Sequence, residues 1–183
     1  KTRHKIWVDF IQHDTSGGSG YESPTQMRNL LKTGNLLFEA TFAASDDAVP
    51  ADWYQSRVDL AMNYIQTYWY VSHGGSWARE WWNPADYQTM YNLMKGFKST
   101  SINEFTVGGN TIDWFAGDKQ FADTIIYRKI SSGVAPNKVS YWSDSGPGNH
   151  LADTAWALLT LEKVAPPADI RVEVELDGEF CGA

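Results

Sequence analysis

Apolar residues along most of this chain recur every three or four positions, which is the spacing of one face of an amphipathic helix. The pattern predicts helices over residues 4–13, 24–44, 52–71, 83–98 and 150–164. A further helix is expected to start at Thr111 and to carry Trp114, Phe115, Phe121, Ile125 and Ile126. Stretches rich in glycine, proline or serine separate the helices, and we expect residues 14–23, 72–75 and 131–149 to be loops.

The pattern changes at the C-terminal end of the chain. Residues 165–168 contain two consecutive prolines, which is typical of a stiff linker. From Ile170 to Leu176, apolar and charged residues alternate, which predicts a strand with one buried face. We therefore divide the chain into a helical domain over residues 1–164, a linker over 165–168, and the first strand of a truncated β-domain over 169–183.

A glutamine near the end of a helix, a glycine-rich turn and then an aromatic residue recur along the chain. The two glutamines are 54 positions apart (66 − 12), and a weaker third copy has Arg128 in the glutamine position. Recurrence at a steady period marks a repeat architecture, in which each supersecondary unit stacks on the next. The residues of these motifs, and of the apolar helix that follows the third copy, are Gln12, Gly18, Tyr21, Gln66, Gly75, Trp77, Trp142 and Trp156.

Glutamine followed by glycine-x-tryptophan on alternating helices resembles the prenyltransferase and squalene-oxidase repeat of the α/α-toroid superfamily. The stretches 33–37, 90–96 and 156–166 are similar to those of large secreted or cell-surface proteins that carry such repeats ahead of immunoglobulin-like domains. The resemblance covers roughly residues 1 to 165. It implies an all-α fold, a toroid fragment of about three helical hairpins followed by the start of a β-sandwich, and an extracellular or cell-surface location.

The chemistries that this superfamily performs each need a motif that the sequence does not contain. Terpene cyclases use Asp-x-Asp-Asp, and the nearest match, Asp46-Asp47, lacks the first aspartate. Protein prenyltransferases hold zinc with Asp, Cys and His, whereas Cys181 lies beyond the helical part. The thioester domains need Cys-Gly-Glu-Gln, and Cys181 is followed by Gly182 and Ala183. We therefore expect no catalytic residue, no metal and no cofactor, and we favour a chain that is not an enzyme.

Two further chemistries remain open at this stage. A polysaccharide lyase would need to neutralise a uronate and to supply a base and a proton donor, and Arg128, Tyr141, Asn149 and His150 lie near the third loop. Asparagine and histidine before a helix are also ordinary capping residues. Oxygen ligands for calcium are present in the loops around Asp14 and Asp144, although without EF-hand spacing. A degenerate terpene-cyclase-like enzyme is the remaining catalytic alternative.

Aromatic residues make up 14% of the chain, and nine of them are tryptophans. We expect most to anchor the core, since many fall on helical periodicity. The alternative is that some of them line a sugar-binding groove. The candidates for such ligand-facing positions are Trp81, Trp82, Tyr87 and Trp114, with Trp77 and Trp142 beside them. Exposure distinguishes the two hypotheses, because stacked, solvent-facing rings favour glycan binding and buried rings favour a scaffold.

Charge and hydropathy narrow the range of partners. Lys and Arg number 15 and Asp and Glu number 22, so the net charge is −7, which disfavours nucleic acid. The longest apolar run, near residues 154–161, is too short to span a bilayer. Three stacked helical pairs would leave an apolar face open at each end. We therefore predict a structural or adhesive repeat module whose partners are the remainder of its own precursor or other subunits of a surface assembly. A glycan is the alternative partner.

Overall fold

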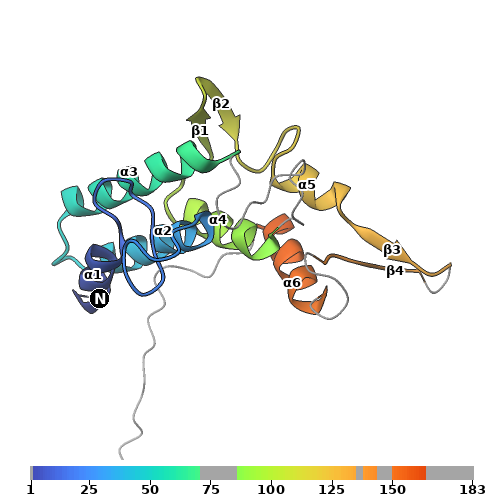
Figure 1. Ribbon diagram of the computed structural model, residues 1–183, viewed down its shortest axis with the longest axis horizontal. Helices are drawn as coiled ribbons and strands as arrows, with labels where there is room; N and C mark the ends of the chain where they lie inside the picture. Colours follow the sequence, from blue (N-terminus) through green and yellow to red (C-terminus); the bar gives the residue numbers. More distant parts are fainter. Residues whose placement is uncertain (1, 71–85, 135–137, 144–149, 164–183) are drawn as a thin grey trace, which may run out of the picture.

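The computed structural model describes residues 2–70, 86–134, 138–143 and 150–163, which contain both helices and strands (Figure 1). The helices among these residues are α1 (Thr2–Ile11), α2 (Leu30–Ala44), α3 (Ala51–Tyr68), α4 (Tyr87–Ser99), α5 (Phe121–Tyr127) and α6 (His150–Leu161). The strands are β1 (Glu104–Val107), β2 (Asn110–Asp113), β3 (Ile130–Ser132) and β4 (Val139–Tyr141). The predicted linker and β-domain, residues 165–183, lie outside the described part of the chain.

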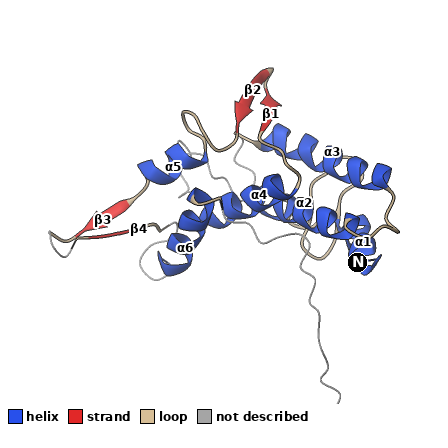
Figure 2. Cartoon of the chain, turned by 180° about the vertical axis from the view of Figure 1, so that it is seen from behind, coloured by secondary structure: helices blue, strands red, loops and turns tan. Residues whose placement is uncertain are grey.

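The prediction of an all-α fold is wrong, because two antiparallel hairpins accompany the helices (Figure 2). Thr111, which we expected to cap a helix, lies in β2 and pairs with Thr106 of β1. Gly108 and Gly109 join the two strands with φ values of +57° and +84°, a conformation that glycine adopts without steric cost. This tight turn reverses the chain, so the next helix, α5, starts only at Phe121.

The second hairpin lies in a segment that we expected to be a loop. Strands β3 and β4 pair in the register Ile130 with Tyr141 and Ser132 with Val139. Their residues alternate weakly between apolar and polar, and each strand has only three residues, so periodicity gave too little signal to predict them. The chain is therefore a mixed α/β protein.

Helix α2 starts later than its apolar spacing predicts. We expected it to begin after Ser23, but its first residue is Leu30. The Asn29 side chain accepts a hydrogen bond of 3.0 Å from the amide of Lys32, which satisfies one of the free amides of the first turn. Met27, with a φ of +49°, cannot belong to a right-handed helix, so the preceding residues form turns.

Helices α2, α4 and α6 lie in one row, with α2 packed on α4 and α4 packed on α6 (Figure 1). Helix α3 packs on α2 at one side of this row, and α5 packs on α6. Gly34 of α2 lies against Leu93 of α4. Nearly two turns farther along both helices, the hydroxyl oxygens of Thr41 and Ser99 are 3.4 Å apart. These contacts advance in the same direction along both helices, so α2 and α4 run parallel.

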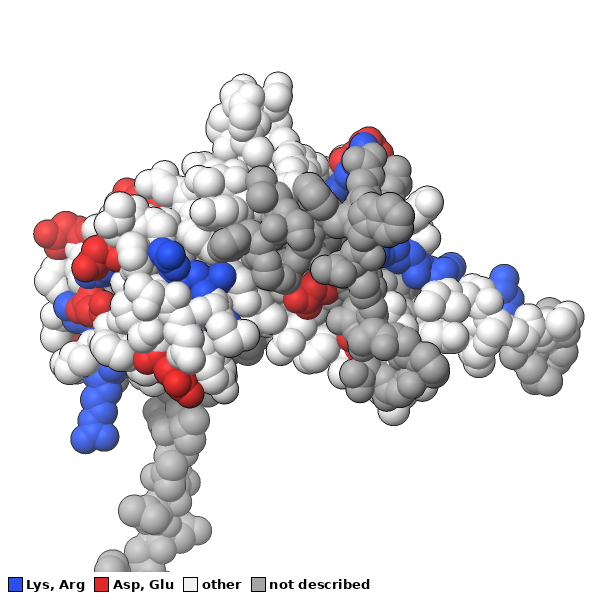
Figure 3. Space-filling view, in the orientation of Figure 1, with Lys and Arg blue, Asp and Glu red and all other residues white. Residues whose placement is uncertain are grey.

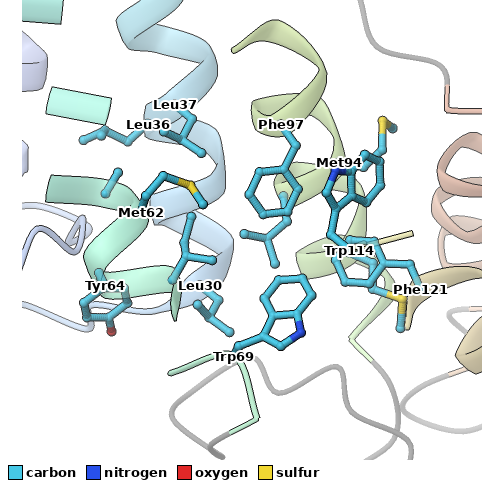
Figure 4. Close-up of a cluster of buried hydrophobic side chains, with 14 of the residues drawn as sticks. Leu30, Leu36, Leu37, Met62, Tyr64, Trp69, Met94, Phe97, Trp114 and Phe121 are labelled. Carbon is cyan, nitrogen blue, oxygen red and sulfur yellow. The ribbon is translucent and has the colours of Figure 1, made fainter. Parts of the chain in front are cut away.

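Aromatic side chains from four elements meet at the centre of the core (Figure 4). Trp69, at the end of α3, stacks on Phe121 of α5 with ring centroids 5.4 Å apart. Phe97 of α4 lies 6.0 Å from Trp69 and 5.3 Å from Trp114. Rings of this size bury large apolar areas and prefer such offset or edge contacts. The cluster therefore joins α3, α4, α5 and the segment after β2 into one core.

Candidate functional site

Gln12 joins the end of α1 to two backbone segments. Its side chain is buried, and Nε2 donates to the carbonyl oxygens of Gly17, at 3.1 Å, and of Arg57, at 2.9 Å. The Gln12 backbone also pairs with Ser19 in an isolated antiparallel bridge. The amide therefore connects α1, the glycine-rich loop and α3, which leaves its polar atoms occupied by the protein itself.

The glycines of this first loop permit close packing. A Cβ atom at Gly18 would stand 2.5 Å from the ring of Tyr64 on α3. Tyr21, at the end of the loop, has 62% of its surface exposed, and the Lys32 ammonium lies 5.4 Å from its ring centroid. Tyr21 therefore contacts α2 through a cation–π interaction with one lysine and leaves most of its ring in solvent.

The second and third copies of the motif are described in part. Gln66 is half-buried on α3, while Gly75 and Trp77 lie outside the described residues. In the third copy, Trp142 is 6% exposed, and its Nε1 donates to the carbonyl oxygen of Ile125 at 2.6 Å. Trp156 is half-buried on α6 and packs against the core.

The candidate ligand-facing aromatics that the structure describes are buried. Tyr87 is 1% exposed and Trp114 is 2% exposed. The Trp114 Nε1 donates to the carbonyl oxygen of Ile102 at 2.8 Å, so its one polar atom has a backbone partner. Trp81 and Trp82 lie outside the described residues. Neither Tyr87 nor Trp114 can stack on a sugar without opening the core.

The sequence analysis did not predict a half-buried polar chain, a row of three hydrogen-bonded side chains on α2 and α4. The Lys95 ammonium donates to Asn35 Oδ1 at 2.6 Å, and Asn35 Nδ2 donates to Glu39 Oε1 at 2.6 Å. Asn35 and Glu39 have the spacing of one helical turn, which a sequence reading could have noticed. Lys95 lies 60 positions from Asn35 and comes close only because α2 and α4 pack together.

Burial dominates the ionisation of this polar chain. It raises the pKa of Glu39, although the charges of His4 and Lys95 and hydrogen bonds from Asn35 and Trp7 act in the opposite direction. Burial also lowers the pKa of Lys95, and the charge of Glu39 partly compensates. Desolvation disfavours the charged form of either group, which explains the opposite directions. The oxygen and nitrogen atoms are satisfied within the protein, which is the arrangement of a helix-to-helix contact.

A second charged cluster joins α1 to α3. Arg57 Nη2 lies 2.9 Å from Asp9 Oδ1, and Lys5 Nζ lies 2.8 Å from Asp9 Oδ2. The Trp53 indole donates to the same carboxylate at 2.6 Å. Burial alone would raise the pKa of Asp9, but these hydrogen bonds and the charges of Arg57 and Lys5 outweigh it and lower the pKa. The Asp9 carboxylate therefore bonds to groups on both helices and holds α1 against α3.

The residues considered for lyase or calcium chemistry do not form a complete site in the described part of the chain. Tyr141 and His150 lie side by side, with ring centroids 5.5 Å apart, and Asn149 lies outside the described residues. Burial lowers the pKa of Arg128, against the charges of Tyr87 and Tyr127. Among the described residues, no group of three or more His, Cys, Asp or Glu side chains is placed to hold a metal ion.

A cavity of about 370 Å³ opens between the end of α2 and the start of α3. The polar side chains of its lining are hydroxyls, with Thr41 Oγ1 3.3 Å from Tyr54 Oη. Hydroxyls alone supply no acid–base pair, and the lining residues include no histidine or carboxylate. Its lining consists of Thr41, Ala44, Ser45, Val49, Ala51 and Tyr54.

Large apolar side chains are exposed at both ends of the helical row. On α1, Ile6, Trp7 and Phe10 are exposed, and the rings of Trp7 and Phe10 lie 5.8 Å apart. At the other end, the exposed set is Ile126, Tyr127, Ile130, Val134, Val139, Leu151 and Leu158. Exposed apolar side chains that lie against each other, as Trp7 and Phe10 do, indicate a site of interaction.

The sequence matches no family model, and comparison with curated proteins and with solved structures gives no significant match. None of the helices in the described part of the chain combines the length and the apolar character needed to cross a membrane.

Proposed function

We propose that this chain is a non-catalytic structural or adhesive repeat module of a secreted or cell-surface protein. The observation that carries the proposal is the burial of Tyr87, Trp114 and Trp142, which are 1%, 2% and 6% exposed. Aromatics that would have to line a ligand groove instead form the core between helices. The secreted or surface location rests on the resemblance to prenyltransferase and squalene-oxidase repeats.

The two apolar ends support a role in assembly. Helices α2, α4 and α6 pack on one another in the row, and α1 and the elements at the other end leave apolar side chains in solvent. Stacked repeat units need a neighbour or a polar cap at each end. We therefore propose that further helical units cover these ends, supplied by the remainder of the same precursor or by other subunits of an assembly.

Binding of a hydrophobic dye to the full chain tests the role of the ends. We expect Ile6→Ser combined with Phe10→Ser to lower bis-ANS fluorescence markedly, because these side chains are exposed on α1. Far-UV circular dichroism and the thermal midpoint should stay close to those of the unchanged protein, since neither residue belongs to the buried core. A large loss of thermal stability would instead place the two residues in the core and remove the support for an open end.

A carbohydrate-binding function is the second candidate, and one observation favours it. Trp7 is 43% exposed and its side chain donates a hydrogen bond to the Glu39 carboxylate. A solvent-facing indole beside a carboxylate is a common arrangement for stacking on a sugar and binding its hydroxyls. Phe10 and Ile6 extend the same exposed surface.

Titration with oligosaccharides separates the two candidates. Tryptophan fluorescence of the full chain is followed while neutral and uronate-containing oligosaccharides are added. The structural proposal predicts no saturable change for either series. Saturable binding that Trp7→Ala abolishes and that Trp156→Phe leaves intact would contradict the structural proposal and establish carbohydrate binding.

A further inference from the structure

The β3–β4 hairpin has open strand edges. Strands β3 and β4 pair only with each other, and in both ribbon views the hairpin extends away from the helices (Figures 1 and 2). Among the described residues, none outside the hairpin forms a hydrogen bond with the backbone of either strand. A lone two-stranded hairpin is marginally stable in water, and an unpaired edge is a template for another strand. The hairpin is therefore suited to accept a third strand.

The two faces of the hairpin differ in character. Residues that pair directly across an antiparallel ladder share a face. Ile130 and Tyr141 pair on one face, which also carries Val139. Ser131 and Ser140 pair on the opposite face, with their hydroxyl oxygens 3.0 Å apart. One face is therefore apolar and the other is polar.

The polar face of the hairpin is also basic. Lys129 directly precedes β3 and Lys138 directly precedes β4, so the alternation of a strand places both on the face of the two serines. Both lysines are exposed, and residues 128–134 and 138–143 contain no Asp or Glu (Figure 3). A strand that fits this hairpin must combine one apolar face with one acidic face.

The strand that the sequence predicts over residues 170–176 has this pattern. Its residues are, in order, Ile170, Arg171, Val172, Glu173, Val174, Glu175 and Leu176. The four apolar residues share one face, and both glutamates share the other. The backbone of a strand needs hydrogen-bonding partners, which a neighbouring strand supplies. Its apolar face matches that of the hairpin, and its glutamates have the opposite charge to the two lysines.

Charge disfavours the other hairpin as the partner of this strand. In β1 and β2, Phe105 pairs with Ile112 on one face, and Glu104 pairs with Asp113 on the opposite face. A third strand with its apolar side chains beside Phe105 would bring its glutamates to the face of Glu104 and Asp113. Like charges on neighbouring strands are destabilising. The β3–β4 hairpin, which has lysines at the equivalent face, is therefore the better partner.

We propose that residues 170–176 add to the β3–β4 hairpin of the same molecule as a third strand, antiparallel to β4. Val174 would then lie opposite Val139 on the apolar face. Glu175 would lie opposite Lys138 on the basic face. A shift by one residue would turn the glutamates to the apolar face, so the alternation of side chains restricts the register. The proposal concerns the edge of the hairpin and is independent of the units proposed to cover the ends of the helical row.

The length of the intervening chain permits this pairing. Tyr141, at the end of β4, lies beside His150 at the start of α6, with ring centroids 5.5 Å apart. Helix α6 has 12 residues and is therefore about 18 Å long. Val172 follows Lys163 by nine residues (172 − 163), which can span up to about 30 Å. The chain can thus return along α6 and run outward beside β4, in the direction opposite to that of β4.

Disulfide formation in the full chain carrying Cys181→Ser tests the pairing. Val139→Cys with Val174→Cys would place two thiols directly opposite each other, close enough for a disulfide. We expect this pair to oxidise at least tenfold faster than Val139→Cys with Glu173→Cys, whose thiols would lie on opposite faces. The oxidised protein should run as a monomer on a non-reducing gel. Val139 is 57% exposed, so circular dichroism of both variants should match the unchanged protein.

Amide hydrogen exchange tests the contribution of charge. Lys138→Glu should accelerate exchange in residues 172–176 by about threefold to tenfold, because it places like charges on neighbouring strands. Adding Glu175→Lys to this variant should restore slow exchange. Lys98→Glu makes the same change of charge at an exposed position on α4 and should leave exchange in residues 172–176 unchanged.

Equal oxidation rates for the two cysteine pairs, or exchange in residues 172–176 as fast as in an unstructured peptide, would overturn the proposal. Disulfides that form only between molecules would also overturn it, since the strand would then add to a second copy. Slow exchange that Lys138→Glu does not change would assign the strand to a separate β-domain. None of these outcomes bears on the burial of Tyr87 and Trp114, which supports the proposed function.

Discussion

Gly34 of α2 and Leu93 of α4 lie in direct backbone contact. A Cβ atom on Gly34 would stand 2.7 Å from the Leu93 amide nitrogen, closer than real Cβ atoms approach. Gly96 repeats the situation from the other helix, since a Cβ atom there would overlap the carbonyl oxygen of Gly34. The two helices can approach this closely only because both positions lack a side chain. These glycines therefore set the spacing of the central helix pair.

Replacing Gly34 with alanine should destabilise the fold. Inserting atoms into a packed contact typically costs about 1–3 kcal/mol. This cost competes with a helix-propensity gain of about 1 kcal/mol for alanine over glycine. We expect the steric term to dominate, because the atoms in the way belong to the backbone of α4 and cannot rotate aside. Thermal unfolding followed by circular dichroism measures the shift in Tm.

Gly108→Asn is the matched control for this substitution. Gly108 has open space around its Cβ direction and a φ of +57°, which asparagine tolerates. Its Tm should stay near that of the unchanged protein. An unchanged Tm for Gly34→Ala would mean that α2 and α4 are farther apart than described.

Gln12→Leu should destabilise the fold more than the similar sizes of the two side chains suggest. The substitution removes both hydrogen bonds from Nε2 and leaves the carbonyls of Gly17 and Arg57 without this donor in a buried place. Leaving a buried polar group unsatisfied costs about 1–3 kcal/mol. Urea unfolding should show a lower midpoint. Gln55→Leu, on the exposed side of α3, should change stability by less than about 0.5 kcal/mol; equal losses in the two variants would contradict the role of Gln12.

Local spacing predicts the helices because a period near 3.6 depends only on neighbouring residues. Periodicity fails as a guide where a turn or a capping residue ends the regular structure. Gly108 and Gly109 turn the chain, so the apolar residues around Trp114 enter the core from a turn and not from a helix. The start of α2 is decided by one side-chain oxygen, that of Asn29, which periodicity does not detect.

Contacts between residues far apart in the sequence are the part of the fold that the sequence alone does not predict. Asn35 and Lys95 are each ordinary surface residues in a helical pattern, and their hydrogen bond exists only once α2 and α4 are parallel and adjacent. Tyr87 and Trp114 satisfy the same pattern whether they face a groove or the core. The choice depends on how the helices are stacked, and only the structure shows that both rings are buried.

Glu39 should make stability depend on pH in the opposite sense from most carboxylates. Burial raises its folded pKa, so the folded state holds the proton more tightly than the unfolded chain does. The resulting stabilisation is full below the unfolded pKa of about 4.3 and is lost as pH rises through the folded value. Glu39→Gln stays neutral and can still accept the Asn35 hydrogen bond. It should therefore be at least as stable as the unchanged protein at pH 7.

Urea midpoints measured between pH 4 and 8 test this prediction. The advantage of Glu39→Gln over the unchanged protein should be largest at pH 7 and should shrink toward pH 4. Glu22→Gln, at an exposed position, is the control and should follow the unchanged protein across the range. A variant that loses more stability at pH 7 than at pH 4 would show that the Glu39 charge is favourable in the fold.

Trp142→Phe tests whether one indole anchors the β3–β4 hairpin. Trp142 follows β4 directly, and its Nε1 donates to Ile125 of α5 at 2.6 Å while its backbone amide donates to Thr154 of α6 at 3.0 Å. Phenylalanine keeps an aromatic ring but removes the indole donor and part of the volume, so we expect a loss of about 1–3 kcal/mol. Amide hydrogen exchange in β4 should accelerate more than exchange in α2, because the Trp142 contacts with α5 and α6 lie directly after β4. Trp156→Phe makes the same chemical change at a half-buried ring on α6 and should have the smaller effect on both measurements. If the two variants lose stability equally and β4 exchanges at its original rate, the indole does not anchor the hairpin, and its strands must be held by contacts elsewhere.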